Sequence, residues 1–143
     1  METKFDSLVT LKKSTLEKSQ EALQKASQNL QNAQDALHSS YELLNEIGLP
    51  QHGSISNMLA SRELLSRQRA SIEQNKKWVD FASSQLELAK QQLKKDMIEH
   101  EKYKYLELEE IQKIIKKQKL QEAKELDEVA LITFEKKKIK GNT

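Results

Sequence analysis

The 143-residue chain contains no cysteine, a single proline and only three glycines. Without cysteine it can form neither a disulfide framework nor a thiolate metal site. Aromatic residues make up 5% of the sequence and charged residues 32%, which is too polar for a thick globular core. We therefore expect a single all-α domain over residues 1–143, built from long helices and holding no cofactor and no metal.

Apolar runs are also short. None approaches the roughly 18 residues of a membrane-spanning helix, and the amino-terminal stretch is too polar for a signal peptide. The net charge is only +2, and no third of the chain is basic enough to demand nucleic acid or anionic lipid. We expect neither a nucleic-acid partner nor direct membrane insertion. The lysines at 136–138 could contact phosphate, but a solvated helix end is the interpretation we favour.

Motifs for catalysis are missing as well. His38, His52 and His100 are far apart, and none forms a metal-binding pair with another histidine. There is no glycine-rich loop for phosphate. Adjacent carboxylates such as Asp127 and Glu128 point about 100° apart on a helix, so they cannot act on one substrate. The sequence predicts a non-enzymatic protein that works by contacting other proteins.

What the sequence does contain is two heptad ladders. Apolar residues recur every seven positions, first at Val9, Leu16, Leu23, Leu30, Leu37 and Leu44, then at Met58, Leu65, Ile72, Val79, Leu86 and Leu93. Residues 48–53 separate the ladders and hold the only proline and two glycines. This pattern indicates one chain folding back into an antiparallel coiled coil.

The positions of glycine, proline and helix-capping residues predict where the helices begin and end. We expect a first helix over residues 4–47, a turn over 48–54 and a second helix over 55–138. Gly48 is expected just past the end of the first helix, and residues 54–57 offer caps for the second. The predicted fold is a long antiparallel two-helix coiled-coil hairpin in which helix two extends beyond helix one.

The symmetry of the ladders predicts a register. Reflection about residue 51 places Leu30 opposite Ile72. A second seam of small residues accompanies the first, and polar Gln68 and Asn75 interrupt it near the turn, where they can fix register at some cost in stability. The small residues are Ser19, Ala26, Ala33 and Ser40 on the first helix, with Ala82 and Ala89 on the second.

The second ladder fails at His100 and Glu107. We therefore expect paired helices to end near Met97. Residues 98–138 would then form a single helix whose apolar side chains need a partner.

The carboxy-terminal third has the most distinctive sequence, with H-E-K-Y-K-Y-L-E-L-E-E-I-Q at 100–112 and E-A-K-E-L-D-E-V-A at 122–130. With the chain length, F-D-S-L-V-T-L at 5–11 and S-N-M-L-A-S-R-E-L-L at 56–65, it resembles the FliJ family. These are coiled-coil stalk and chaperone-escort proteins of the flagellar type III export ATPase. The family pattern usually has arginine after L-D-E-x-A, whereas residues 131–133 are Leu, Ile and Thr here, so the resemblance does not carry over an arginine-mediated contact.

The resemblance implies the partners and the place of work. The joined termini would enter the central hole of a hexameric export ATPase, promoting assembly and activity of the ring. The flank of the hairpin would contact a membrane export-gate protein and export chaperones. The implied location is cytoplasmic, peripheral to the inner membrane at the flagellar base.

The resemblance also implies two sets of contact residues. The ATPase-binding set is Leu8, Leu11, Tyr103, Leu106, Glu107, Glu122, Leu126, Asp127 and Glu128. The export-gate set is Tyr41, Leu44, Leu65 and Ile72. For the three aliphatic members of the gate set we favour coil core over gate contact, and for Leu8 core and partner contact are equally open.

Two other readings of the sequence remain open. One is a generic structural tether or homodimeric spacer in which the 98–138 segments of two chains pair. The other is a chaperone that clamps apolar partners between its helices.

Overall fold

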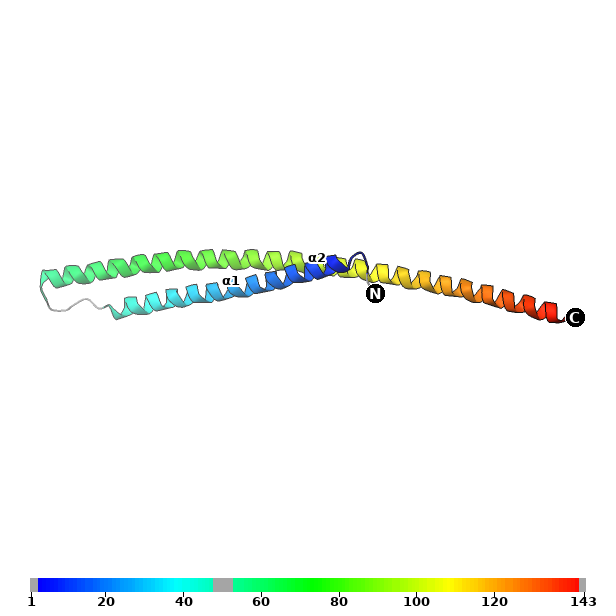
Figure 1. The fold of residues 1–143 in the computed structure, drawn as a ribbon. Helices are drawn as coiled ribbons and strands as arrows, with labels where there is room; N and C mark the ends of the chain where they lie inside the picture. Colours follow the sequence, from blue (N-terminus) through cyan, green and yellow to red (C-terminus); the bar gives the residue numbers. More distant parts are fainter. Residues whose placement is uncertain (1–2, 48–52, 142–143) are drawn as a thin grey trace. The chain divides into compact units, whose positions relative to one another are not determined.

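The computed structural model describes residues 3–47 and 53–141, which form two helices. Helix α1 runs from Asp6 to Glu46 and helix α2 from Ile55 to Gly141 (Figure 1). The described residues contain no strand, and α2 is the longer helix, so the predicted all-α, two-helix hairpin is confirmed. The turn expected at 48–54, including Gly48, falls mostly outside the described residues.

Side chains cap the start of each helix. The hydroxyl of Thr3 accepts a hydrogen bond from the Phe5 backbone N–H at 3.2 Å, just before α1. Ser54 does the same for the N–H of Asn57 at 3.3 Å, as the sequence predicted for α2. Gly53 precedes this cap with φ of +155°, a conformation that residues with a side chain rarely adopt.

The chain divides into two compact units. The first, which we call the hairpin unit, is Ser14–Ile98, and the second, the terminal unit, is Met1–Lys13 with Glu99–Thr143. In the hairpin unit, α1 and α2 lie side by side and run in opposite directions (Figure 1). Each unit is described separately below.

The core of the hairpin unit is a line of small residues between the helices. Its buried residues are Ser19, Ala33, Ser40, Ile72 and Ala82. The leucines of the first ladder are half-buried beside them. Small residues let helix axes approach closely, so the predicted small seam is confirmed in this unit.

The register of the hairpin unit differs from the prediction. Asn75 Nδ2 donates hydrogen bonds to Ser40 Oγ and, at 3.4 Å, to the Ala36 carbonyl. In the predicted register Asn75 would have been level with Ser27 instead. Ser40 also accepts a hydrogen bond from Gln68 at its carbonyl, so it lies between Gln68 and Asn75, about level with Ile72. The same alignment puts Leu30 about level with Ala82, about ten residues from the predicted Ile72. The prediction was wrong.

The physical reason is that the leucine ladder and the small seam, three residues apart, both lie on the buried face, so a slip of about ten residues pairs large with small residues and keeps that face buried. Apolar periodicity therefore cannot choose between registers, whereas polar groups can. A second polar contact is consistent with the observed register, because Ser19 Oγ donates a hydrogen bond to Asp96 Oδ2 at the other end of the unit. Residues 55–60 of α2 are all exposed, and in Figure 1 they lie beyond the end of α1.

In the terminal unit, pairing continues beyond the predicted limit near Met97. Lys12 Nζ lies 3.7 Å from Glu99 Oε2 and 5.6 Å from the centre of the Tyr103 ring. Half-buried positions recur on α2 as far as Ile114, whereas every residue from Ile115 to Gly141 is exposed. The limit was misplaced because His100 and Glu107, read as ladder failures, are half-buried at heptad positions. Within the described ranges, neither helix has a stretch apolar enough to cross a membrane.

Candidate functional site

The predicted gate residues differ in accessibility. Ile72 is only 5% exposed in the seam of the hairpin unit, and Leu44 and Leu65 are half-buried there. Tyr41 is 41% exposed on the flank of the same unit. Of the four, Tyr41 therefore offers the most surface to another molecule.

Tyr41 belongs to a small polar group on this flank. Lys76 Nζ lies 3.3 Å from Glu73 Oε1. The pKa of Lys76 is raised above its ordinary value, first by the hydrogen bond with Glu73 and then by one with Tyr41. The ammonium group thus stays charged beside the Tyr41 hydroxyl, which gives the flank a fixed polar feature next to an aromatic ring.

Sequence reasoning missed an apolar groove in the hairpin unit. Trp78, Phe81 and Leu88 are all exposed on α2, although two of them are among the few aromatic residues in the chain. Phe81 and Leu88 line an open groove of about 600 Å³, together with Ala22, Lys25, Ala26, Asn29, Gln85, Ala89, Gln91, Gln92 and Lys95. The sequence feature that could have revealed this groove is the presence of large apolar residues at positions outside the heptad ladder.

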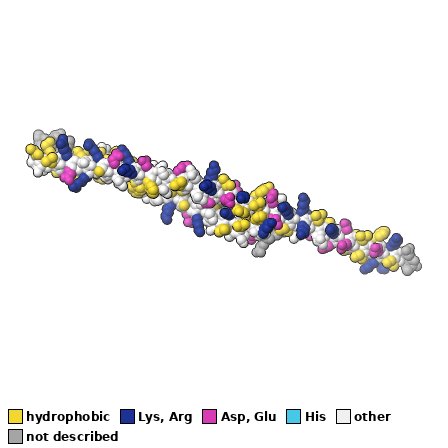
Figure 2. Space-filling model, turned by 90° about the horizontal axis from the view of Figure 1, so that it is seen from above, with side chains coloured by type: hydrophobic (Ala, Val, Ile, Leu, Met, Phe, Trp, Pro, Cys, Tyr) yellow, Lys and Arg dark blue, Asp and Glu magenta, His cyan; other side chains and the backbone are white. Residues whose placement is uncertain are grey.

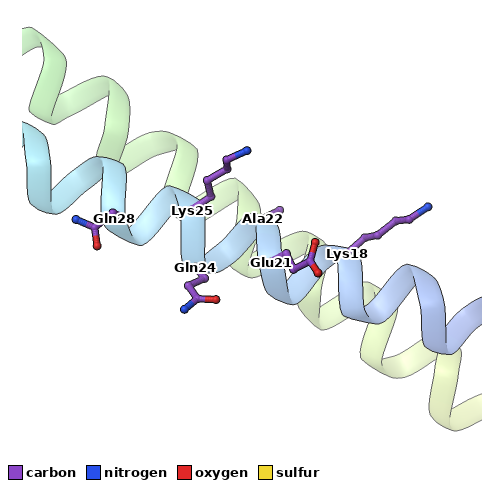
Figure 3. A pocket seen from close by; sticks show the side chains of 6 residues that line it. All are labelled: Lys18, Glu21, Ala22, Gln24, Lys25 and Gln28. Carbon is purple, nitrogen blue, oxygen red and sulfur yellow. The ribbon is translucent and has the colours of Figure 1, made fainter.

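A second groove lies along α1 and is polar. Its lining is Lys18, Glu21, Ala22, Gln24, Lys25 and Gln28 (Figure 3). Figure 3 shows the long side chains of these residues pointing in different directions and away from the helix pair. Because they do not converge on a point, they form a solvated face and not a site for chemistry.

The predicted ATPase residues fall into two groups within the terminal unit. Tyr103, Leu106 and Glu107 are half-buried on α2, opposite the start of α1 that carries Leu8 and Leu11. Both leucines are exposed. The fold therefore brings these five residues into one region of the unit.

Charged side chains contact the Tyr103 ring and one another in this region of the terminal unit. The Lys102 ammonium lies 5.4 Å from the centre of the Tyr103 ring, and that of Lys12 lies at a similar distance from it. The pKa of Glu107 is raised, first by partial burial and then by a hydrogen bond with Asp6. Two carboxyl groups, one from α1 and one from α2, thus face each other at the start of α1.

The remaining ATPase residues lie further along α2. Glu122, Leu126, Asp127 and Glu128 are all exposed, and Leu126 is 69% exposed. They belong to the exposed stretch from Ile115 to Gly141, which we call the free helix. Figure 2 shows hydrophobic and charged side chains mixed along this end of α2.

None of these regions resembles a metal centre. In the part of the chain that the structure describes, no three His, Asp or Glu side chains gather closely enough to hold an ion. The chemistry on offer is that of surfaces, namely aromatic rings, exposed leucines and paired charges.

Comparison with known proteins gives one match. The family described as Flagellar FliJ protein matches residues 1–138 of this chain. No curated protein and no solved structure matches it. Because the match spans nearly the whole sequence and agrees with the two-helix fold, the chain belongs to the FliJ family, which gives it a role related to flagellar export.

Proposed function

We propose that this protein is the non-enzymatic stalk and chaperone escort of the flagellar type III export ATPase. In this role it promotes assembly and activity of a hexameric ring and links the ring to the membrane export gate. It works in the cytoplasm, at the inner-membrane face of the flagellar base. Membership of the FliJ family gives the setting for this proposal.

The observation that carries the proposal is the free helix. It presents Leu120, Leu126, Leu131, Ile132 and Phe134 to solvent, each more than half exposed. Isolated chains seldom leave so much apolar surface uncovered without a partner. Insertion into a ring would cover it, and tighter contact with one arrangement of ring subunits than with another would stimulate turnover.

The hairpin unit supplies the second contact in this proposal. Tyr41 and the groove beside Phe81 and Leu88 are its exposed aromatic and apolar features. Gate and chaperone binding would use these surfaces, because Leu44, Leu65 and Ile72 are occupied with packing between the helices.

The test is ATP turnover by the cognate hexameric export ATPase with and without this protein. We expect stimulation by the unmodified chain and at least a tenfold higher half-maximal concentration for Leu126→Glu, since a charge replaces an apolar contact. Leu43→Glu is the matched control, because Leu43 is also exposed, at 52%, but lies on α1 of the hairpin unit.

Circular dichroism must show that both variants keep their helices. Absence of stimulation by the unmodified chain would contradict the proposal and favour a structural tether. Equal stimulation by a folded Leu126→Glu protein would show that the ring contacts another surface.

A further inference from the structure

The start of α2 joins an uncharged stretch of sequence to a strongly basic one. No Asp, Glu, Lys or Arg stands at residues 47–61, which is the longest such gap in a sequence whose charged residues make up 32%. The three arginines of the chain follow this gap directly, at Arg62, Arg67 and Arg69. We call residues 55–69, which belong to the hairpin unit, the tip segment.

The observed register leaves the beginning of the tip segment without a partner from α1. Because Ser40 is about level with Ile72, the last residue of α1, Glu46, is about level with Ser66. Residues 53–60 are all exposed, and in Figure 1 the start of α2 lies beyond the end of α1. Large side chains in this part of α2 are therefore available to another molecule.

Three large apolar side chains gather on the uncharged part of the tip segment. Ile55 is 77% exposed, Met58 is 51% exposed and Leu59 is 59% exposed. Their spacing of three and four residues puts them on one face of the helix. Such a cluster on one face, unlike single scattered leucines, is typical of a contact surface.

The face that carries these apolar residues continues into a basic hollow. At further spacings of three and four residues come Arg62, Ser66 and Arg69, which line a shallow hollow of about 300 Å³ together with Leu65. Two guanidinium groups beside a hydroxyl suit a phosphate group, because the guanidinium fork presents paired N–H donors to its oxygens.

Little negative charge offsets the arginines. Glu63 is the one carboxylate of the tip segment, and its Oε1 lies 2.7 Å from Nη2 of Arg67. Within the described ranges, Arg62 and Arg69 form no ion pair, so their charge is left for an anionic partner.

The order of these side chains distinguishes between possible partners. An apolar end followed by guanidinium groups matches an anionic lipid bilayer, in which acyl chains lie beneath a layer of phosphates. A nucleic acid would contact the arginines but leave Ile55 and its two apolar neighbours in water. A helix laid along a protein groove needs apolar residues over its whole length, whereas on this face they stop at Leu59.

We infer that the tip segment docks the hairpin unit on the headgroup layer of an anionic membrane. Ile55, Met58 and Leu59 reach the boundary between headgroups and acyl chains. Arg62 lies about 7 Å further along the helix than their midpoint, at 1.5 Å per residue, and there it meets the phosphates, with Arg69 adding attraction from the same face. The inference does not rest on the proposed function, because a lipid surface is neither the ring, nor the gate, nor a chaperone.

Flotation of the purified full-length chain with lipid vesicles tests the inference. One set of vesicles is phosphatidylcholine alone, and the other contains about one third phosphatidylglycerol, which is anionic. We expect binding to the anionic vesicles to be at least about tenfold stronger than to the neutral ones, and to weaken as salt is added.

A first pair of variants tests the charge. Arg62→Gln combined with Arg69→Gln should weaken binding to the anionic vesicles about tenfold, because two phosphate contacts are lost. The matched control combines Lys136→Gln with Lys137→Gln, which removes the same charge from the lysine run near the other end of α2. It should bind within about twofold of the unmodified chain.

A second pair tests the apolar contact. Ile55→Ser combined with Leu59→Ser should also weaken binding about tenfold, since less apolar surface enters the membrane. The matched control makes the same two changes at Ile98 and Leu108, which are 56% and 57% exposed. It should bind as the unmodified chain does.

Circular dichroism must show that each variant keeps its helices. No binding to the anionic vesicles, or equal binding to both kinds of vesicle, would overturn the inference. Weaker binding in the lysine control with full binding by the arginine variant would also overturn it, because the lipid would then contact the other end of α2. Equal losses in the tip variant and the control at Ile98 and Leu108 would likewise reject the tip segment as the contact.

Discussion

The hairpin unit and the free helix use similar residues for opposite purposes. In the hairpin unit, alanine and leucine recur on one face at heptad spacing, and Ala33 is fully buried against α2. In the free helix, alanine and leucine stand next to each other, and Ala130 and Leu131 are exposed. Spacing, more than composition, decides whether an apolar residue stabilises the fold or is left for a partner.

The strongest test of this difference makes the same substitution, alanine to glutamate, once in the hairpin unit and once in the free helix. Ala33→Glu should lower the free energy of unfolding by about 3 kcal/mol or more, because it buries an unpaired charge between the helices. Ala130→Glu should change it by about 0.5 kcal/mol or less, because the site is exposed. Urea unfolding followed by circular dichroism measures both, and similar losses would contradict the division into a folding region and a binding region.

The register of the hairpin unit offers a second, smaller test. Asn75→Ala removes the hydrogen bonds to Ser40 Oγ and the Ala36 carbonyl and should cost about 1–2 kcal/mol. Gln68→Ala removes a 2.8 Å bond to the Ser40 carbonyl and should cost about 1 kcal/mol.

Cysteine pairs can show whether these contacts select the register. Ala33 is about level with Val79 in the observed register, one heptad from the Ser40 position between Gln68 and Asn75, so cysteines at 33 and 79 should crosslink within one chain. Cysteines at Ala33 and Gln68, which the mirror register would bring together, should not. Crosslinking of the second pair in a chain that retains Asn75 would mean that polar contacts do not set the alignment.

The smallest expected effect concerns pH in the terminal unit. The pKa of Glu107 is raised from its ordinary 4.5 by partial burial and by Asp6. A carboxyl group with a raised pKa favours folding most below its unfolded pKa, and this contribution is lost as the pH rises through the folded value. Pairing of the start of α1 with α2 should therefore weaken from about pH 4.5 upward.

Hydrogen exchange of residues 6–13, corrected for intrinsic rate, measures this change. Glu107→Gln should flatten the dependence, because a neutral amide beside Asp6 does not ionise. Glu99→Gln is the matched control, since Glu99 contacts Lys12 and not Asp6. An unchanged slope in Glu107→Gln would assign the pH dependence to another group.

The sequence predicted the face of each helix well and the alignment poorly. The small seam at Ser19, Ala33 and Ala82 followed from heptad spacing, because that spacing fixes which residues point inward. Alignment depends instead on particular hydrogen bonds, such as that from Asn75 to Ser40, which cannot be inferred until both helices are in place.

The candidate sites divide in a similar way. Positions such as Leu126 came from family resemblance, and the structure shows only that they are exposed. The groove beside Phe81 was missed because attention to the seam treated off-seam residues as solvated. Glu107 was read as the end of pairing, since a carboxylate in an apolar ladder looks like a failure unless its neighbour Asp6 is known.

Two of the polar contacts between the helices of the hairpin unit also limit how such a chain can change length. Ser19 and Ser40 are 21 residues apart on α1, and their partners Asp96 and Asn75 are 21 residues apart on α2. One extra heptad in a single helix would preserve the apolar face yet break one of the two contacts. Chains of this design can therefore grow or shrink only by matched changes in both helices, so the spacing of polar residues works as a ruler shared between them.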